Sequence, residues 1–359
     1  LSSPRPAWKK SAIWHSYRCG PNRPRSCDKV IAMKGYLGVD VGSVSTNLVL
    51  LDESGGVAAS VYLRTMGQPI RAVQEGLREL GAQLPGDVEV LGAGTTGSAR
   101  HLSGIIVGAD IVKNEITAHA VAALHVVPEV RTVLEIGGQD SKIIVLQDGI
   151  VVDFAMNTVC AAGTGSFLDH QAARLAIPIE EFGSYALRAE TGVQIAGRCS
   201  VFAESDMIHK QQVGHPIENI IFGLCEALVR NYLNNLAKGK SIEPPVVFQG
   251  GVAANVGMKR AFEEALKMEV VVPEHYNVMG AIGAALLAKE LNPPVSNFKG
   301  FRVTDIAYRT SSFNCKGCSN NCEIVKIMVE GDTLARWGGR CGKWELDLPG
   351  AKTAGAAAR

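Results

Sequence analysis

The sequence lacks any run of eighteen consecutive apolar residues, although 47% of its 359 residues are hydrophobic. A membrane-spanning helix needs about twenty such residues, so we expect no membrane segment. The sequence also lacks an excess of charge of either sign, since 36 Lys and Arg stand against 35 Asp and Glu. Nucleic-acid binding uses a dense basic surface, and this balance gives no support for it. We therefore expect a cytoplasmic protein that binds neither nucleic acid nor membrane.

The charge is unevenly spread along the chain. Residues 1–34 carry eight Lys or Arg and one Asp, net +7, so the remainder carries 28 basic and 34 acidic residues, net −6. The same stretch has four prolines and lacks the apolar core of a secretory signal. We interpret residues 1–34 as a disordered or non-native extension; a basic tail with a binding role is the alternative. Residues 346–359 are also expected to be disordered.

The pattern G-x-x-x-x-G-K-[ST] is absent too, which excludes a P-loop protein. In its place the sequence has three glycine turns, each next to an apolar strand pattern: GVDVGSVSTN, LEIGGQDSK and VVFQGGVAAN. Glycine lets backbone N–H groups approach a phosphate, and hydroxyl groups add further donors. Any one turn alone would be interpreted as a tight hairpin. Three in this order predict nucleotide binding.

The turns supply candidate catalytic and binding residues. Asp40 ends the first strand and is expected to hold a magnesium ion, usually through water. In the second turn, Gln139 or Asp140 is expected to orient the attacking water near the γ-phosphate. The residues expected to bind the nucleotide are Gly42, Ser43, Ser45, Thr46, Gly137, Gly138, Gly250, Gly251 and Asn255.

Residues 35–60 and 130–157 share one layout. Each has an apolar strand, an acid, a glycine turn, a second apolar strand and a further turn. This weak internal duplication suggests two related domains, which we place at 35–130 and 131–291. Helical patterns occur near residues 70–81, 113–125, 166–176, 200–213, 217–238 and 278–291. Strands that alternate with helices indicate an α/β fold.

The order GVDVGSVSTN, LEIGGQDSK, VVFQGGVAAN, MGAIGAA resembles the superfamily of acetate and sugar kinases, Hsp70 and actin. That resemblance implies two duplicated ribonuclease-H-like domains with ATP in the cleft between them. Within the superfamily, NTVCAAGTGSFLD and GRCSVFAESDMIHKQQVG look like the ATP-dependent activators of 2-hydroxyacyl-CoA dehydratases and the related ATPase subunits of benzoyl-CoA reductase. The match runs from about Tyr36 to Leu291. One departure is Glu135, where the wider superfamily often has Asp.

Cys160 and Cys199 lie 39 positions apart, and each precedes a helical pattern. The spacing of Ser166 and Asp169 predicts a capping pair at the helix that follows Cys160. From the residues alone, buried thiols, a disulfide and half of a zinc site all compete, although a cytosolic setting disfavours the disulfide. A 4Fe–4S cluster typically needs four thiolates, which a two-fold homodimer would supply. The resemblance implies that interpretation, with one cluster per dimer.

The resemblance also implies the activity. ATP binding and hydrolysis would move the two domains, and the cluster would pass one electron to a partner acyl-CoA dehydratase or reductase. Reduced ferredoxin or flavodoxin would recharge the cluster. Two other functions compete: a small-molecule kinase of the same fold, such as an amino-sugar kinase, and a non-redox scaffold switched by nucleotide. Neither explains Cys160 or Cys199, and a brown dimer purified without oxygen would exclude both.

A small Cys-rich C-terminal unit is expected at residues 300–345, after the Pro-containing stretch NPPVSNFKG. It holds Cys315, Cys318, Cys322 and Cys341. Four thiols with this clustering suggest a second metal site, either zinc or iron–sulfur. Reduced thiols in a small β-unit are the alternative. Minimal activators end near the helical pattern 278–291, so this segment departs from them and resembles part of larger fused members.

Overall fold

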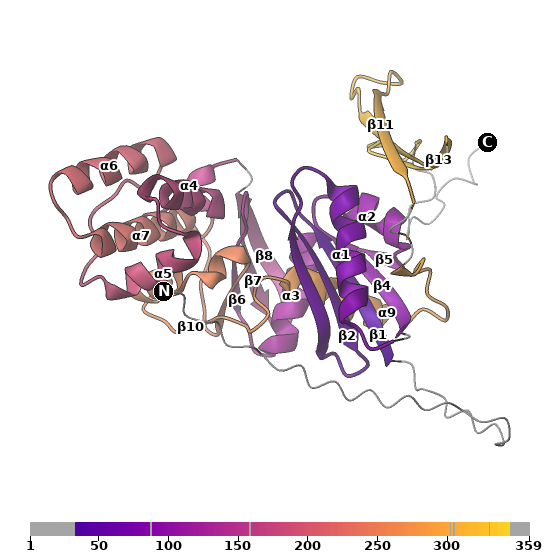
Figure 1. The fold of residues 1–359 in the computed structure, drawn as a ribbon, viewed down its shortest axis with the longest axis horizontal. Coiled ribbons are helices and arrows are strands. Elements are labelled where there is room, and N and C mark those ends of the chain that lie inside the picture. The colour runs from indigo at the N-terminus through magenta and orange to yellow at the C-terminus, as the bar shows by residue number, and fades with distance from the viewer. Residues whose placement is uncertain are drawn as a thin grey trace, which may run out of the picture. The chain divides into compact units, whose positions relative to one another are not determined.

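A computed structural model of the chain describes residues 33–344, apart from 87, 158, 302, 304, 305 and 330 (Figure 1). Almost all of the predicted extension 1–34, and the whole of 346–359, therefore lie outside the described residues. In the described part of the chain, no helix is long and apolar enough to cross a membrane.

The first of two five-stranded sheets is built by the N-terminal third of the described chain, coloured indigo in Figure 1. Its strands are β1 (Met33–Val41), β2 (Ser45–Asp52), β3 (Val57–Arg64), β4 (Val88–Thr96) and β5 (Ile111–Val112). They lie in the order β3-β2-β1-β4-β5, with β1 to β3 antiparallel and β4 and β5 parallel to β1. Continuous apolar runs in β1 and β2 are buried along almost their whole length, as strands covered on both faces are.

The second sheet repeats the order of the first. Its strands are β6 (Thr132–Ile136), β7 (Ser141–Gln147), β8 (Ile150–Asn157), β9 (Val246–Gln249) and β10 (Val270–Val271). They lie in the order β10-β9-β6-β7-β8, again with three antiparallel strands followed by two parallel ones. The α/β class is confirmed, and each predicted glycine turn follows the first or fourth strand of a sheet.

The helices of the described residues are α1 (Pro69–Gln83), α2 (Arg100–Val107), α3 (Glu115–Val126), α4 (Gly165–Leu175), α5 (Ile179–Arg188), α6 (Ser200–Gln212), α7 (Ile217–Asn235), α8 (Val256–Leu266) and α9 (Met279–Leu291). The six predicted helical patterns correspond to α1, α3, α4, α6, α7 and α9. Helices α2, α5 and α8 were not predicted from the sequence; they have eight to eleven residues each. Short helices offer few turns of periodicity, so their pattern is weak.

Helix α9 packs against the first sheet, although it comes last among the helices. Ala281, Ile282 and Ala285 share a core cluster with Tyr36 and Val49 of that sheet. A Cβ added to Gly38 of β1 would collide with the backbone carbonyl of Ala281. Small residues in MGAIGAA thus bring the helix backbone close to the strand. The boundary between 130 and 131 stays a prediction.

Three further antiparallel strands follow, shown in yellow in Figure 1: β11 (Tyr308–Asn314), β12 (Glu323–Val329) and β13 (Asp332–Trp337). The apolar stretch EIVKIMV forms β12. Ile327 and Ala335 are fully buried and belong to the same core cluster as Leu77 of α1. Strand β12 pairs with both β11 and β13, so the buried side chain of Ile327 lies on the central strand of this small sheet.

Candidate functional site

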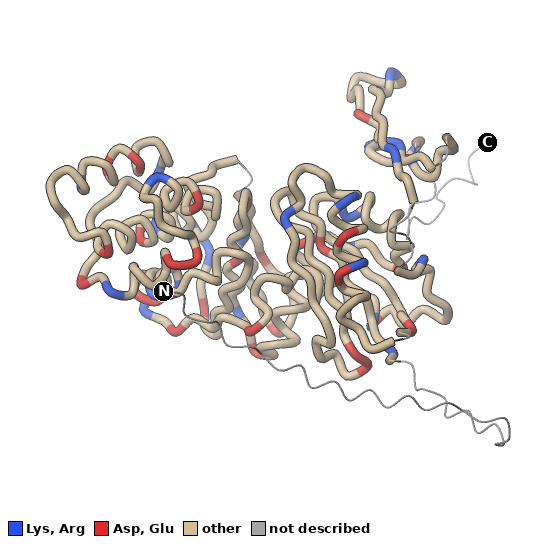
Figure 2. Tube along the Cα trace, viewed as in Figure 1, with Lys and Arg blue, Asp and Glu red and all other residues tan. Residues whose placement is uncertain are grey.

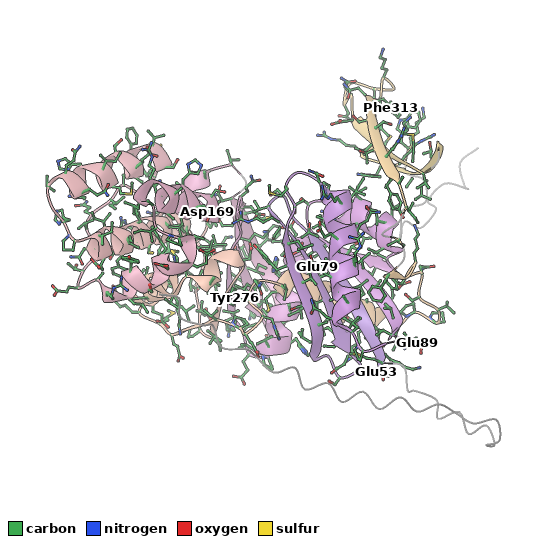
Figure 3. The ribbon with its side chains drawn as sticks, viewed as in Figure 1. Glu53, Glu79, Glu89, Asp169, Tyr276 and Phe313 are labelled. Atoms are coloured by element: carbon green, nitrogen blue, oxygen red, sulfur yellow. The ribbon has the colours of Figure 1, made fainter. Side chains whose placement is uncertain are left out.

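The three predicted glycine turns line one cavity. From the first turn come Asp40, Gly42, Ser43 and Ser45; from the second Gly137, Gly138, Gln139 and Asp140; from the third Gly250 and Gly251. Each turn lies at the end of an interior strand of its sheet: β1, β6 or β9. Tyr276, labelled in Figure 3, lines the same cavity.

A second cavity adjoins the first and shares Val44, Tyr62, Gly138 and Gly251 with it. Asn255 lines this second cavity, as does Asp169 of α4, which Figure 3 labels. The Asn255 side-chain oxygen caps α8 by accepting from the N–H groups of Gly257 and Met258. Its Nδ2 is buried and has no hydrogen-bond partner in the described residues. A ligand in this cavity would find an unused donor there.

Thr46 stands apart from the other predicted binding residues. It does not appear among the described residues that line either cavity. Its hydroxyl group is buried and lies 2.9 Å from the hydroxyl of Thr65, within hydrogen-bond distance. In this structure Thr46 therefore ties the first turn to the end of β3.

Hydrogen bonds inside the turns set their shape. The N–H of Gly42 donates to the Ser45 carbonyl at 2.9 Å, and the N–H of Gly137 donates to the Asp140 carbonyl at 3.0 Å. Gly250 has φ +92°, a left-handed conformation that favours glycine. Its N–H donates to the Tyr276 carbonyl at 2.8 Å. These three amides are already used, so the glycines shape the turns around the cavity.

A buried lysine connects three acids at the base of the first cavity. The Nζ of Lys142 lies 2.7 Å from Asp140 Oδ2, 2.9 Å from Glu135 Oε2 and 3.0 Å from Glu115 Oε2. Burial alone would lower the pKa of Lys142, but its three acidic partners raise that pKa well above the ordinary value. Lys142 is therefore a fixed positive charge.

Two carboxyl groups of the cavity hold their protons unusually firmly. Burial, opposed by Lys142, raises the pKa of Glu135 to about 8. Burial, together with the negative charge of Glu115, raises the pKa of Asp40 to about 7. Four acids surround one lysine, so the site is short of positive charge. A bound cation would favour the ionised forms of these acids.

His119 and Asn47 complete the polar lining of this cavity. Burial, and then the charge of Lys142, lower the pKa of His119 to about 3, so its imidazole is neutral. His119 Nδ1 lies 2.8 Å from the side-chain nitrogen of Gln249, whose N–H donates to it. The side-chain oxygen of Asn47 is buried without a partner in the described part of the chain.

Three residues of this cavity were not predicted from the sequence: Lys142, Glu115 and His119. Lys142 had a usable signal, because a lysine in the otherwise apolar strand SKIIVL must be buried and paired. Glu115 and His119 lie on α3, next to the Asn114 cap. Nothing in their local pattern shows that α3 faces the cavity.

The segment that carries Cys160 is hydrogen-bonded to the second glycine turn. Cys160 precedes a short 3-10 turn, Ala161–Gly163, which leads into α4. The N–H of Gly165 donates to the Gly137 carbonyl at 2.9 Å. Ser166 donates to the Gly138 carbonyl twice, from its N–H at 2.8 Å and from its hydroxyl at 2.5 Å.

The predicted capping pair of Ser166 and Asp169 is therefore wrong. The N-cap of α4 is Thr164, which makes no side-chain cap hydrogen bond. The Ser166 hydroxyl instead reaches the second turn, where the Gly138 carbonyl accepts from it. A contact between segments distant in sequence outcompetes the local capping pattern here.

Both cysteine segments contact Asn231 of α7. The Asn231 side-chain N–H donates to the Gly197 carbonyl at 2.5 Å, just ahead of Cys199. A Cβ added to Gly163 would lie 2.6 Å from Asn231 Oδ1, so the segment after Cys160 packs against the same side chain. Cys199 is the N-cap of α6, as the helical pattern predicts. Both cysteines are half-buried free thiols.

Apolar side chains beside the two cysteines are exposed in the single chain. Val159 is 94% exposed, Val201 65% and Phe202 66%. Val159 directly precedes Cys160, and Val201 and Phe202 are the second and third residues after Cys199. Large apolar residues that are this exposed are typical of a surface that a protein partner covers when they form a contiguous patch.

The described residues of one chain contain no group of three or more His, Cys, Asp or Glu side chains that could hold a metal ion. In the C-terminal sheet the Cys315 thiol accepts from the indole N–H of Trp344 at 3.2 Å and from the Gly317 N–H at 3.4 Å. These hydrogen bonds, the indole one first, lower the pKa of Cys315. Metal binding by Cys315, Cys318, Cys322 and Cys341 stays a prediction.

The chain is similar to known proteins that agree with one another in the family they indicate. The sequence model of the BadF/BadG/BcrA/BcrD ATPase family matches residues 37–288. The 2-hydroxyisocaproyl-CoA dehydratase activator of Clostridioides difficile is 33% identical over 272 residues, which cover 73% of this chain and 98% of the relative. The (R)-2-hydroxyglutaryl-CoA dehydratase activating ATPase of Acidaminococcus fermentans is 34% identical over 256 residues, 70% of this chain and 96% of the relative.

A solved structure agrees with these matches. It is the activator of the 2-hydroxyisocaproyl-CoA dehydratase from Clostridium difficile with bound ADPNP. It superposes with a TM-score of 0.66 at 31% identity, over 72% of this chain and 95% of that one.

Proposed function

Because this chain belongs to the BadF/BadG/BcrA/BcrD ATPase family, we propose that it is an ATPase that activates an acyl-CoA dehydratase or reductase. It would do so as a homodimer, by giving its partner one electron from a shared 4Fe–4S cluster. The observation that carries this proposal is the set of hydrogen bonds between the second glycine turn and the segment of Cys160. Through these hydrogen bonds, a movement of the second turn on ATP binding or hydrolysis would shift the segment that carries Cys160.

The cavity fits Mg²⁺ and ATP. Three acids share Lys142, Asp40 lines the same cavity, and the Asn47 side-chain oxygen is a buried acceptor without a partner in the described residues. Asp40 and Asn47 would hold the ion, with water and phosphate oxygens as its other ligands, which is the usual way Mg²⁺ binds. Mg²⁺ neutralises charge on the transferred phosphate. Ser43, Ser45 and Gly138 would contact phosphates, and Asn255 the adenosine.

Gln139 and Asp140 are the candidates for positioning the attacking water. Both line the cavity on the second turn. The Nζ of Lys142 lies 2.7 Å from Asp140 Oδ2 and holds that carboxyl group in place. A carboxylate oxygen accepts a hydrogen bond from water, which would orient that water toward the γ-phosphate.

The two cysteines fit a cluster at a two-fold axis. Each chain offers two free, half-buried thiols, and both segments contact Asn231. Two chains together supply the four thiolates that a 4Fe–4S cluster needs. Such a cluster carries one electron at low potential. Exposed Val159, Val201 and Phe202 would be covered in the dimer.

The shared order of the two sheets supports the interpretation of two duplicated ribonuclease-H-like domains. Ligands that bind between two such halves favour a closed arrangement. Closure on ATP would move the second turn, and with it the start of α4. Reduced ferredoxin or flavodoxin is the proposed source of the electron, and a Cys-rich metal site in the C-terminal unit remains a further proposal.

Anaerobic metal analysis combined with size exclusion tests the cluster. The parent dimer should hold about four bridging iron atoms. Cys160→Ser should lose them and loosen the dimer, because one substitution removes a ligand from both subunits. Cys225→Ala is the matched control, since burial raises the pKa of that thiol to about 12 and it lies in the core. A Cys160→Ser protein that keeps all its iron would refute the proposal.

A further inference from the structure

A groove beside the cysteine segments is lined by three cations. They are Arg198, directly before Cys199, Arg230 on α7, and Lys238 just after α7. The other described residues that line it are neutral: Gly197, Asn231, Leu233, Asn234 and Asn235. Figure 2 marks the basic residues of this part of the chain in blue. The groove is thus a positively charged concave surface.

The charges of this groove are largely uncompensated. Among the described residues, none of the three cations takes part in a salt bridge. The Arg230 guanidinium donates to the Ile195 carbonyl at 2.6 Å, which fixes its position and leaves its charge in place. Glu226, one turn earlier on α7, feels the attraction of Arg230, although burial raises its pKa.

The groove shares a wall with both cysteine segments. Asn231 lines the groove and holds the Gly197 carbonyl, and Gly163 packs against its side-chain oxygen. A molecule seated in the groove would therefore lie next to the segments of Cys160 and Cys199. The charge, the concave shape and the position together suggest that the groove serves electron transfer.

We propose that this groove docks an acidic protein that carries a low-potential one-electron cofactor. The inference rests on the proposed function, because it assigns the surface at which an electron donor would bind to reduce the cluster. One electron would leave the reduced carrier, which becomes oxidised, and reduce the oxidised cluster; no covalent bond forms or breaks. Electron-transfer complexes have small interfaces and short lifetimes, and opposite charges on the two proteins speed their association.

The test removes charge from the groove at the two cations that do not adjoin a cysteine in sequence. Arg230→Gln with Lys238→Glu removes three units of positive charge, one at the first site and two at the second. Glutamine at position 230 keeps an amide donor for the Ile195 carbonyl that Arg230 contacts. Arg71→Gln with Arg78→Glu is the matched control, because it makes the same change at two exposed positions on α1. Arg198 stays unchanged because it adjoins Cys199.

Two measurements follow, both at low ionic strength of about 20 mM, where charges are weakly screened. Stopped-flow absorbance follows reduction of the cluster by an acidic ferredoxin. The groove variant should be reduced roughly tenfold more slowly than parent and control, and the difference should vanish at about 0.5 M salt. Reduction by the methyl viologen radical cation should not slow. A calorimetric titration with oxidised ferredoxin should show weaker binding for the groove variant than for the parent, and unchanged binding for the control.

Equal ferredoxin rates and affinities for parent and groove variant would overturn the docking proposal. Equal slowing with viologen would overturn it as well, because a cationic reductant gains from the lost charge. Slower activation of a partner dehydratase with unchanged ferredoxin kinetics would assign the groove to another protein. A parent dimer without iron would instead refute the proposed function, and the calorimetric titration would still decide whether the groove binds the carrier.

Discussion

The raised pKa values of Glu135 and Asp40 make the stability of the ligand-free protein depend on pH. Glu135 titrates near pH 8 in the folded chain, against 4.5 as its ordinary value, and Asp40 near 7, against 3.8. An acid whose pKa is higher in the folded state is penalised when it ionises there. The penalty grows as the pH rises from the unfolded to the folded pKa, so stability falls over that range.

The size of the effect follows from the two shifts. One pH unit within this range costs about 1.4 kcal/mol per group. Between about pH 6 and 8, Glu135 contributes about 2 kcal/mol and Asp40 about 1 kcal/mol, so the parent should lose about 3 kcal/mol of unfolding free energy. The Glu135→Gln variant has no ionisable group at that position. Its unfolding free energy should therefore fall by only about 1 kcal/mol over the same interval.

Urea denaturation of the metal- and nucleotide-free chain, followed by circular dichroism at several pH values, measures this loss. Glu79→Gln is the control, because Glu79 lies exposed on α1 (Figure 3) and should leave the slope unchanged. Added Mg²⁺ and nucleotide should flatten the parent curve, because a cation at the site favours ionised Asp40. If the unfolding free energy of the Glu135→Gln variant fell with rising pH as steeply as that of the parent, our account of the buried acids would be refuted.

Three further predictions concern hydrolysis, coupling and the dimer. Asp40→Asn with Asp140→Asn should lower Mg²⁺-dependent phosphate release about a hundredfold or more while the dimer persists in size exclusion; parent-like turnover would show that the site is misassigned. Ser166→Ala removes one of the hydrogen bonds to the second turn, so the rates of iron chelation by bathophenanthroline with ADP and with an ATP analogue should become more alike; an unchanged difference would argue against this coupling route. Phe202→Asp should weaken the dimer at least tenfold in sedimentation velocity, because a carboxylate would be buried there; an unchanged dimer would place the interface elsewhere.

The glycine turns were predictable from sequence because each is a local pattern. A strand that ends in an acid or a polar residue before glycines forms its turn from neighbouring residues, and Asp40, Gly138 and Gly251 all line one cavity. Lys142 and Glu115 could not be paired from sequence, since their contact depends on how α3 packs against β7. Such contacts arise from tertiary packing, for which the chain carries no local pattern.

The two cysteines illustrate the same division. Their positions ahead of helices follow from local periodicity and are confirmed for Cys199 as the N-cap of α6. The contact of both segments with Asn231 joins residues more than thirty positions apart, as the spacing of Asn231 and Gly197 shows. Ser166 likewise satisfied a capping pattern while its hydroxyl bonded elsewhere. Local patterns therefore located these residues without revealing what they touch.

The packing of α9 on the first sheet has a consequence for synthesis of the chain. Tyr36, Val49 and Leu51 emerge early from the ribosome, yet the residues that bury them, Met279 to Ala288, come more than two hundred positions later. Until then, that face of the first sheet stays open to water, and contacts of such sequence separation form slowly. The first half of this protein therefore lacks the helix that completes this one cluster. We expect the nascent chain to need a chaperone until α9 is made, because an open apolar face aggregates readily.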